Sequence, residues 1–238
     1  MNQDVVDYND YHTRGHVAPA DDLVQPVFAP DAQFQAAFPR LAELLALARI
    51  TPVTRNGALH YLYGWTRNSG GSVGWLSPPP RAPEGRQLHH DHSTMLAHFG
   101  GIVKYWGESG NSSWLCNLNW CLTAANSGGG FADGVSGWET GWRDYYFEEC
   151  AAEGVEPTVD PNEYITFTEE ANSNRTLYHR ETAAVIMFLY DHAFDFVEPY
   201  HETASRWYSL LFYRVKNCPD FRTWVEMLAG QWLGIVRG

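Results

Sequence analysis

The sequence lacks the features that would place the chain in a membrane or in a disulfide-bonded class. Its longest apolar run, residues 183–190, has eight residues, whereas a helix that crosses a bilayer needs about 20. The first residues, MNQD, have no apolar segment of the kind that signal peptides contain. Four cysteines without any C-x-x-C spacing favour free thiols in a reducing compartment. We therefore expect a cytoplasmic protein with no membrane partner.

The common catalytic motifs are missing as well. The sequence has no G-x-S-x-G, no H-E-x-x-H and no G-x-x-x-x-G-K-[ST] pattern. The most metal-like segment is the run HHDH at 89–92. On a helix His89 and His92 would share a face while the two residues between them point elsewhere, which makes these two imidazoles weak metal candidates. We expect no cofactor and no enzymatic activity; the alternative is a metal-dependent enzyme that uses residues 89–98.

The composition, 45% hydrophobic and 18% charged, is that of a globular protein, and its formal net charge is −12. Most of that charge comes from residues 136–174, which contain ten acidic side chains and one base, Arg143. Such a field repels the phosphates of nucleic acids and speeds the encounter with basic proteins. The charge therefore argues against direct nucleic-acid binding and favours a basic protein partner.

The acidic stretch also contains regularly placed aromatic residues. Tryptophan and tyrosine are common anchors in protein interfaces, and carboxylates pair with the Lys and Arg of a basic partner. The residues predicted to bind the partner are Trp138, Glu139, Trp142, Asp144, Tyr145, Glu148 and Glu149. The other interpretation is that residues 142–152 form an ordinary amphipathic helix, which ends at Gly154, with one face buried.

The apolar periodicity predicts an α+β fold. Residues 1–30 show no periodicity and are expected to form a flexible, poorly packed arm before a single domain over 31–238. The expected helices cover 31–48 (split at Pro39), 87–99, 142–152 and a segment that starts at Pro219. The expected strands are 59–65, 72–76, 102–106, 113–119, 164–168, 175–179, 185–190 and 207–215. The last four strands form an antiparallel meander, on which the stripe Phe221, Trp224, Leu228 and Trp232 of the final helix is predicted to pack.

Three segments together resemble the SMI1/KNR4 (SUKH) superfamily. One is the helix end LAHFGG at 96–101, which is similar to the apolar helix that closes in a Gly-Gly turn in that family. The second is the meander YITFT, TLYH and AVIMF within 164–188, and the third is the closing helix DFRTWVEML at 220–228. The resemblance covers about 60% of the chain. The N-terminal 85 residues and the insertion at 138–149 depart from the family pattern.

The resemblance implies a SUKH-like domain that binds other proteins and catalyses no reaction. Bacterial members of the superfamily are largely intracellular immunity proteins that neutralise polymorphic toxins. We therefore expect an immunity protein whose partner is a basic toxin domain, for example a nuclease. A scaffold or a phage-borne factor that binds a host protein is the further alternative.

Overall fold

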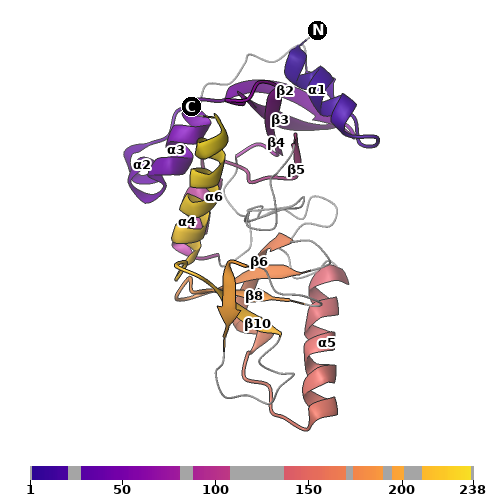
Figure 1. Cartoon of the computed structure of the whole chain (residues 1–238), viewed down its shortest axis with the longest axis vertical. Coiled ribbons are helices and arrows are strands. Elements are labelled where there is room, and N and C mark those ends of the chain that lie inside the picture. The colour runs from indigo at the N-terminus through magenta and orange to yellow at the C-terminus, as the bar shows by residue number, and fades with distance from the viewer. Residues whose placement is uncertain are drawn as a thin grey trace.

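The structure, a computed structural model, describes residues 2–20, 28–80, 88–107, 137–169, 174–189, 195–200 and 211–236. The fold is α+β, as predicted: it contains two five-stranded antiparallel sheets together with helices. Figure 1 shows the first sheet at the top of the molecule and the second sheet below it. Helix α6 (Phe221–Val236) runs along one side of the molecule from the second sheet towards the first.

The first sheet has its strands in sequence order, β1-β2-β3-β4-β5. They are β1 (Ala18–Pro19), β2 (Arg49–Arg55), β3 (Ala58–Thr66), β4 (Ser72–Ser77) and β5 (Lys104–Trp106). Strands β2 and β3 form a hairpin whose two-residue turn is Asn56-Gly57, with positive φ at both residues. Such a turn matches the twist of antiparallel strands. The sequence predictions had β3, β4 and β5 but not β2.

Each face of the first sheet packs against different elements. Tyr63, Trp65 and Trp75 belong to the main core, which also contains α6. On the other face Leu62 and Trp106 pack with residues of α1 (Gln3–Tyr11) in a smaller cluster. Because strand residues alternate between faces, this sheet separates two apolar clusters, and we call the side that carries α1 its outer face.

The N-terminal segment differs from the predicted arm. Residues 3–11 form α1, and Val5, Tyr8 and Val17 are buried against the outer face of the first sheet. The prediction of a poorly packed arm is wrong for this segment. Two apolar residues three positions apart are enough for a short helix when an apolar sheet face is there to receive them.

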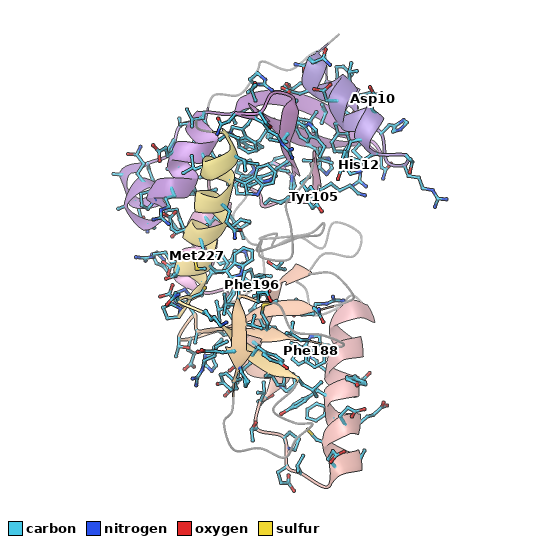
Figure 2. All side chains as sticks on the ribbon, in the orientation of Figure 1. Asp10, His12, Tyr105, Phe188, Phe196 and Met227 are labelled. Atoms are coloured by element: carbon cyan, nitrogen blue, oxygen red, sulfur yellow. The ribbon has the colours of Figure 1, made fainter. Side chains whose placement is uncertain are left out.

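The second sheet has the order β6-β7-β8-β10-β9. Its strands are β6 (Tyr164–Glu169), β7 (Arg175–His179), β8 (Val185–Phe188), β9 (Val197–Pro199) and β10 (Phe212–Val215). The predicted meander is confirmed by β6, β7, β8 and β10, while β9 is an edge strand that was not predicted. Alternation again divides the faces. Phe167 and Met187 face the main core, whereas Leu177 and Phe188 face α5 (Gly137–Glu153), and Phe188 lies between the sheet and that helix (Figure 2).

The remaining helices cover the main core. They are α2 (Ala32–Ala37), α3 (Pro39–Ala46) and α4 (His90–Leu96), and a short 3-10 helix, η1 (Pro161–Glu163), precedes β6. The predicted break at Pro39 is confirmed, since this proline occupies the first turn of α3, where its missing N–H costs nothing. The predicted helix over 87–99 is shorter than expected and is followed by Gly101 with φ +85°.

The apolar stripe of α6 is buried, as predicted, but it contacts more than the meander. Phe167 of the second sheet meets Trp224 edge-on with ring centroids 4.9 Å apart. Eight residues further along the helix, Trp232 contacts Trp75 and Trp65 of the first sheet at 4.9 and 5.7 Å. Helix α6 therefore joins the inner faces of both sheets into one core.

Some predictions fall outside the described residues. These are the strand expected at 113–119, the first part of the strand expected at 207–215, and Cys116 and Cys121. The other two cysteines, Cys150 and Cys218, are buried free thiols, as expected. Burial raises the pKa of Cys218 to about 12, so this thiol is unreactive at neutral pH.

Candidate functional site: the acidic face of helix α5

Helix α5 packs on the face of the second sheet that points away from the main core, which we call the outer face of that sheet. The contact is made through residues spaced four apart. Trp142, Tyr146 and Cys150 form its buried stripe. The ring of Trp142 lies 5.4 Å from that of Phe188, and the ring of Tyr146 lies 5.0 Å from that of Phe212. This i, i+4 spacing places the three residues on one side of the helix, and the opposite side is left facing solvent.

Polar contacts fix the C-terminal end of α5 to the segment that follows it. The Tyr146 hydroxyl accepts hydrogen bonds from the backbone N–H groups of Thr158 and Val159, at 2.9 and 3.0 Å. Between Tyr146 and Thr158 the chain reverses at Gly154, whose φ of +66° suits a residue without Cβ. At the other end, Arg143 donates to the Pro161 carbonyl oxygen at 3.1 Å. The helix is therefore held in one orientation, with a defined exposed face.

The structure corrects the predicted role of Trp142. Its side chain is 5% exposed, packs on Phe188 and Phe212, and cannot serve as an anchor for a partner. Tyr145 is half-buried and contacts Phe188 edge-on. Both rings cover the apolar outer face of the second sheet. For Trp142 the alternative interpretation is therefore correct: this residue belongs to the buried face of an amphipathic helix.

The exposed side of α5 combines carboxylates with one large aromatic ring. We call Asp144, Phe147, Glu148 and Ala151 the acidic face of α5, since they are exposed and lie three or four residues apart. Phe147 is 44% exposed, an unusual position for a phenylalanine. Glu149 is half-buried at the edge of this face. Trp138 and Glu139 lie in the helix, but their side chains are outside the described residues.

Sequence reasoning missed Phe147. The sequence shows only that residue 147 lies outside the 142, 146 and 150 stripe on a helical wheel. The deciding fact, which stripe faces the sheet, depends on tertiary packing. Two of the predicted carboxylates, Asp144 and Glu148, are placed beside Phe147 and point to solvent. The predicted site therefore retains the exposed carboxylates of Asp144 and Glu148, and Phe147 replaces Trp142 as its exposed aromatic ring.

The surroundings of this face keep its charge negative. Within residues 142–163 the sequence has seven acidic side chains and a single base, Arg143. That base is directed away from the face, because its guanidinium lies over the Trp142 ring at 5.9 Å and donates to Pro161. Glu153, Glu156 and the other acids of the stretch add to the same field, which favours a cationic partner.

The histidine segment was the alternative site, and its side chains serve other purposes. The Nδ1 of His89 accepts from the Asp91 N–H and caps α4. His92 is fully buried, with its Nδ1 3.0 Å from the Tyr178 hydroxyl and its ring 4.7 Å from that of Phe221. His89 and His92 therefore do not converge on a shared point. In the described part of the chain no group of three or more His, Cys, Asp or Glu could hold a metal ion.

Asp91 in the same segment forms an ion pair that joins two helices. Its carboxylate accepts from the guanidinium of Arg222 on α6 at 2.7 Å. This hydrogen bond and the charge of Asp91 raise the pKa of Arg222. The contact fixes α4 against α6, a structural function, and leaves Asp91 unsuited to proton transfer.

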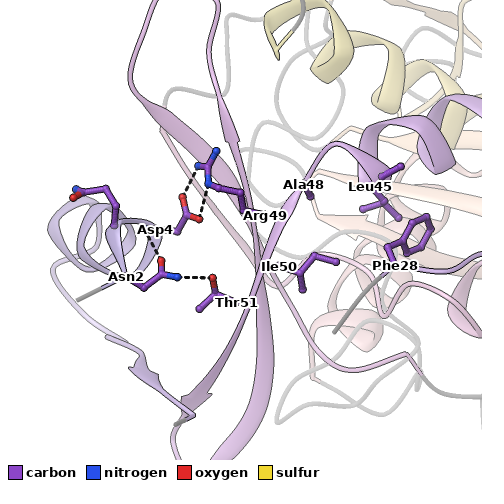
Figure 3. A pocket seen from close by; sticks show the side chains of 10 residues that line it. Asn2, Asp4, Phe28, Leu45, Ala48, Arg49, Ile50 and Thr51 are labelled. Carbon is purple, nitrogen blue, oxygen red and sulfur yellow. Dashed lines mark hydrogen bonds and ion pairs between the residues drawn. The ribbon is translucent and has the colours of Figure 1, made fainter. Parts of the chain in front are cut away.

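A cavity of about 520 Å³ lies where the N-terminus of α1 meets the start of β2. Figure 3 shows its polar wall, Asn2, Asp4, Arg49 and Thr51, on one side, and Phe28 with Leu45 on the other. The polar groups satisfy one another. Arg49 donates to both oxygens of Asp4 at 2.7 and 3.1 Å, and Asn2 donates to the Thr51 hydroxyl at 2.9 Å. This pairing holds α1 on the sheet, so we assign the cavity a structural rather than a catalytic origin.

Comparison with known proteins adds no relative. Neither a scan of family models nor searches of curated proteins and of solved structures found a match to this chain. Among the described residues no helix has the length and apolar character required to cross a bilayer.

Proposed function

We propose that this protein binds a basic protein partner through the acidic face of α5 and performs no catalysis. The observation that carries the proposal is Phe147, an exposed aromatic ring on the same side of the helix as the exposed side chains of Asp144 and Glu148. The helix does not need this ring for its own packing, since its other stripe already covers the sheet. An aromatic anchor surrounded by charge is the usual composition of an interface hot spot.

The finer proposal concerns the kind of partner. We infer an immunity protein that neutralises a basic toxin domain, such as a nuclease, in the cytoplasm. Two observations support it: the resemblance to the SUKH superfamily, and the negative field over residues 142–163. The segments that carry the resemblance form α4 with its Gly-Gly end, the β6-β7-β8 meander and α6. An acidic face can occupy the cationic groove with which a nuclease binds phosphates.

The first experiment identifies the partner by site-specific crosslinking. A photoreactive phenylalanine analogue is placed at Phe147 and, in a matched control, at Leu47, an apolar residue that is 51% exposed on another part of the surface. We expect a basic protein to crosslink at position 147 only. Equal crosslinking at both positions, or capture of an acidic protein, would contradict the proposal.

The second experiment measures association with the captured partner over a salt series. Phe147→Ala should weaken binding by about thirtyfold, the equivalent of about 2 kcal/mol, and should leave the unfolding free energy within about 0.5 kcal/mol of wild type. Glu148→Lys should slow association most strongly at low salt, because exposed charges are screened over about 8–10 Å at physiological ionic strength. Leu47→Ala is the control and should change neither the affinity nor the association rate. An association rate that changes neither with salt nor with Glu148→Lys would contradict binding through the acidic face of α5.

A further inference from the structure

A cluster of basic side chains lies on the outer face of the first sheet, at the end of α1 opposite Asp4. Val53, Leu62 and Trp106 of this face pack with α1. Alternation and register place further residues on the same side: Arg55, two positions after Val53; His60, which pairs with Val53; and Lys104, two positions before Trp106. Strands β2, β3 and β5 thus each carry a basic group on the side of the sheet that α1 covers.

Two more histidines come from the segment that follows α1. His12 ends the helix, and its Nε2 donates to the Tyr105 carbonyl oxygen at 2.9 Å; the two residues lie together in Figure 2. His16 in turn donates to the His12 carbonyl oxygen at 2.9 Å. Gly15, with φ +74°, lies against Arg55, so that a Cβ at this position would be 3.0 Å from the guanidinium. The segment is shaped to fit around the Arg55 side chain.

The cluster has positive charges and no matching carboxylates. Across the described residues no ion pair involves Arg55 or Lys104. Burial and then the charge of Arg55 lower the pKa of Lys104 and of His60. Burial and then Lys104 lower the pKa of His12. The groups are therefore close enough to repel one another, an arrangement that a bound anion would relieve.

A second, independent observation points to a missing ligand. Tyr8 of α1 is 0% exposed, and its hydroxyl has no hydrogen-bond partner within the described part of the chain. The Nε of Arg55 is likewise buried and unpaired there. Burial raises the pKa of Tyr8 to about 12, and the charge of Arg55 opposes that rise. The ring of Tyr8 lies 4.5 Å from that of His12, at the end of α1 where the cluster lies. Buried donors are nearly always paired in native proteins.

We propose that Tyr8, Arg55, His60 and Lys104 bind the phosphate group of a small ligand, either free phosphate or a phosphomonoester. Guanidinium, ammonium and hydroxyl donors from three directions suit a tetrahedral oxyanion better than the two oxygens of a carboxylate. This site is separate from the acidic face of α5. It lies on the other sheet and has the opposite charge.

The test is phosphate binding by the full chain, measured by calorimetry and by thermal unfolding. Inorganic phosphate and glycerol phosphate are compared with chloride and acetate at equal ionic strength. Because a ligand of the native state stabilises it by mass action, we expect phosphate, and not chloride or acetate, to raise the melting temperature. A larger rise with glycerol phosphate than with phosphate identifies an esterified ligand, and the reverse identifies free phosphate.

Two variants locate the site and separate binding from folding. Lys104→Gln and Tyr8→Phe should each weaken phosphate binding by about tenfold, since each removes a donor to a charged ligand. Without phosphate both variants should be as stable as wild type or more stable, because one loses a repelled charge and the other an unpaired buried hydroxyl. A purely structural role for these groups predicts the opposite, a loss of stability in both buffers. Arg40→Gln, which removes an exposed base elsewhere, is the matched control.

Two results would overturn the proposal. One is a melting temperature that responds equally to phosphate, chloride and acetate. The other is phosphate binding that Lys104→Gln and Tyr8→Phe leave at the wild-type or Arg40→Gln level, which would place the anion at a different site.

Discussion

The two sheets share one plan and are attached to their outer helices by different forces. Each has five antiparallel strands, an inner face on the α6 core and an outer face covered by one helix. Helix α5 is held by a stripe of rings, with Trp142 and Tyr146 on Phe188 and Phe212. Helix α1 buries two apolar side chains, Val5 and Tyr8, and depends also on the ion pair between buried Asp4 and half-exposed Arg49.

The two outer helices also lie beside charges of opposite sign. A helix that is fixed by apolar contacts can carry any residue on its solvent side, and α5 carries Asp144, Phe147 and Glu148 there. Helix α1 is paired with the sheet through Asp4 and Arg49, and the outer face of the first sheet also holds Arg55 and Lys104, which take no part in that attachment. One architecture thus presents an acidic surface on one sheet and a basic one on the other.

The largest expected effect comes from breaking the core that both sheets share. Trp224 is 0% exposed and packs on Phe167, so Trp224→Ala should lower the unfolding free energy by about 3–5 kcal/mol. Denaturant unfolding measures the loss, and hydrogen exchange shows where it falls. We expect amides of β3 and β7 to exchange faster together. Faster exchange confined to the second sheet would show that α6 does not couple the two.

The next effect tests the apolar attachment of α5. Trp142→Ala should cost about 3 kcal/mol, because it leaves a cavity against Phe188 and Phe212. Phe147→Ala, on the opposite side of the same helix, is the matched control and should change stability by less than about 0.5 kcal/mol. Equal effects of the two variants in thermal or denaturant unfolding would mean that the inward face of α5 has been assigned wrongly.

The ionic attachment of α1 should be weaker. Asp4→Ala removes a carboxylate that accepts from Arg49 and from the Ser72 hydroxyl at 3.1 Å. We expect a loss of about 2 kcal/mol, less than for a fully buried pair because the Arg49 side chain is half-exposed. Asp10→Ala, an exposed acid on the same helix, is the control for denaturant unfolding and should be neutral.

Gly64→Ala gives an independent check on the same contact. A Cβ at position 64 would lie 2.6 Å from the Asp4 carboxylate, so the substitution should displace Asp4 and reproduce the loss seen with Asp4→Ala. Full stability of Gly64→Ala would show that α1 does not rest on the sheet through this carboxylate.

The smallest effect is the pH dependence of stability, which we expect to come from two histidines at the first sheet, His12 and His60. Burial, with help from Lys104 and Arg55, lowers the pKa values of His12 and His60 below 6.5 in the folded state. The unfolded chain therefore takes up protons first. The resulting stabilisation is complete above about pH 6.5 and is lost as pH falls through that value towards the folded pKa values. Denaturant unfolding between pH 5.5 and 7.5 should show this slope, and His60→Gln should flatten it. A slope unchanged by His60→Gln would assign it to other groups.

Strong periodicity explains which elements could be predicted from the sequence. Strands β3, β4, β6 and β7 alternate, β8 is a continuous apolar run, and α6 repeats large apolar residues every three or four positions. Strand β2 (Arg49–Arg55) was missed because Pro52 and basic residues interrupt its pattern. Proline is tolerated there since β2 has only the two-residue β1 beside it. The fold class followed from local pattern, whereas β2 and α1 depend on what packs against them.

The candidate site shows the same limit. Its net charge is a property of composition and could be predicted. Which of Trp142 and Phe147 faces solvent could not, because α5 has aromatic rings on both sides and the second sheet selects one of them. The basic cluster was missed for a related reason. Arg55 and Lys104 are 49 positions apart and meet only through the register of four strands.

The position of α6 in the sequence has a consequence for synthesis on the ribosome. Residues 221–236 follow every strand of both sheets, yet they complete the inner face of each. A nascent chain that has released both sheets but not α6 exposes Trp65, Trp75 and Phe167 to solvent. Translation adds about 5–20 residues per second, so this state lasts for seconds and presents a surface that chaperones bind. Closure of the core therefore follows translation of α6, and the N-terminal half cannot complete its folding ahead of it.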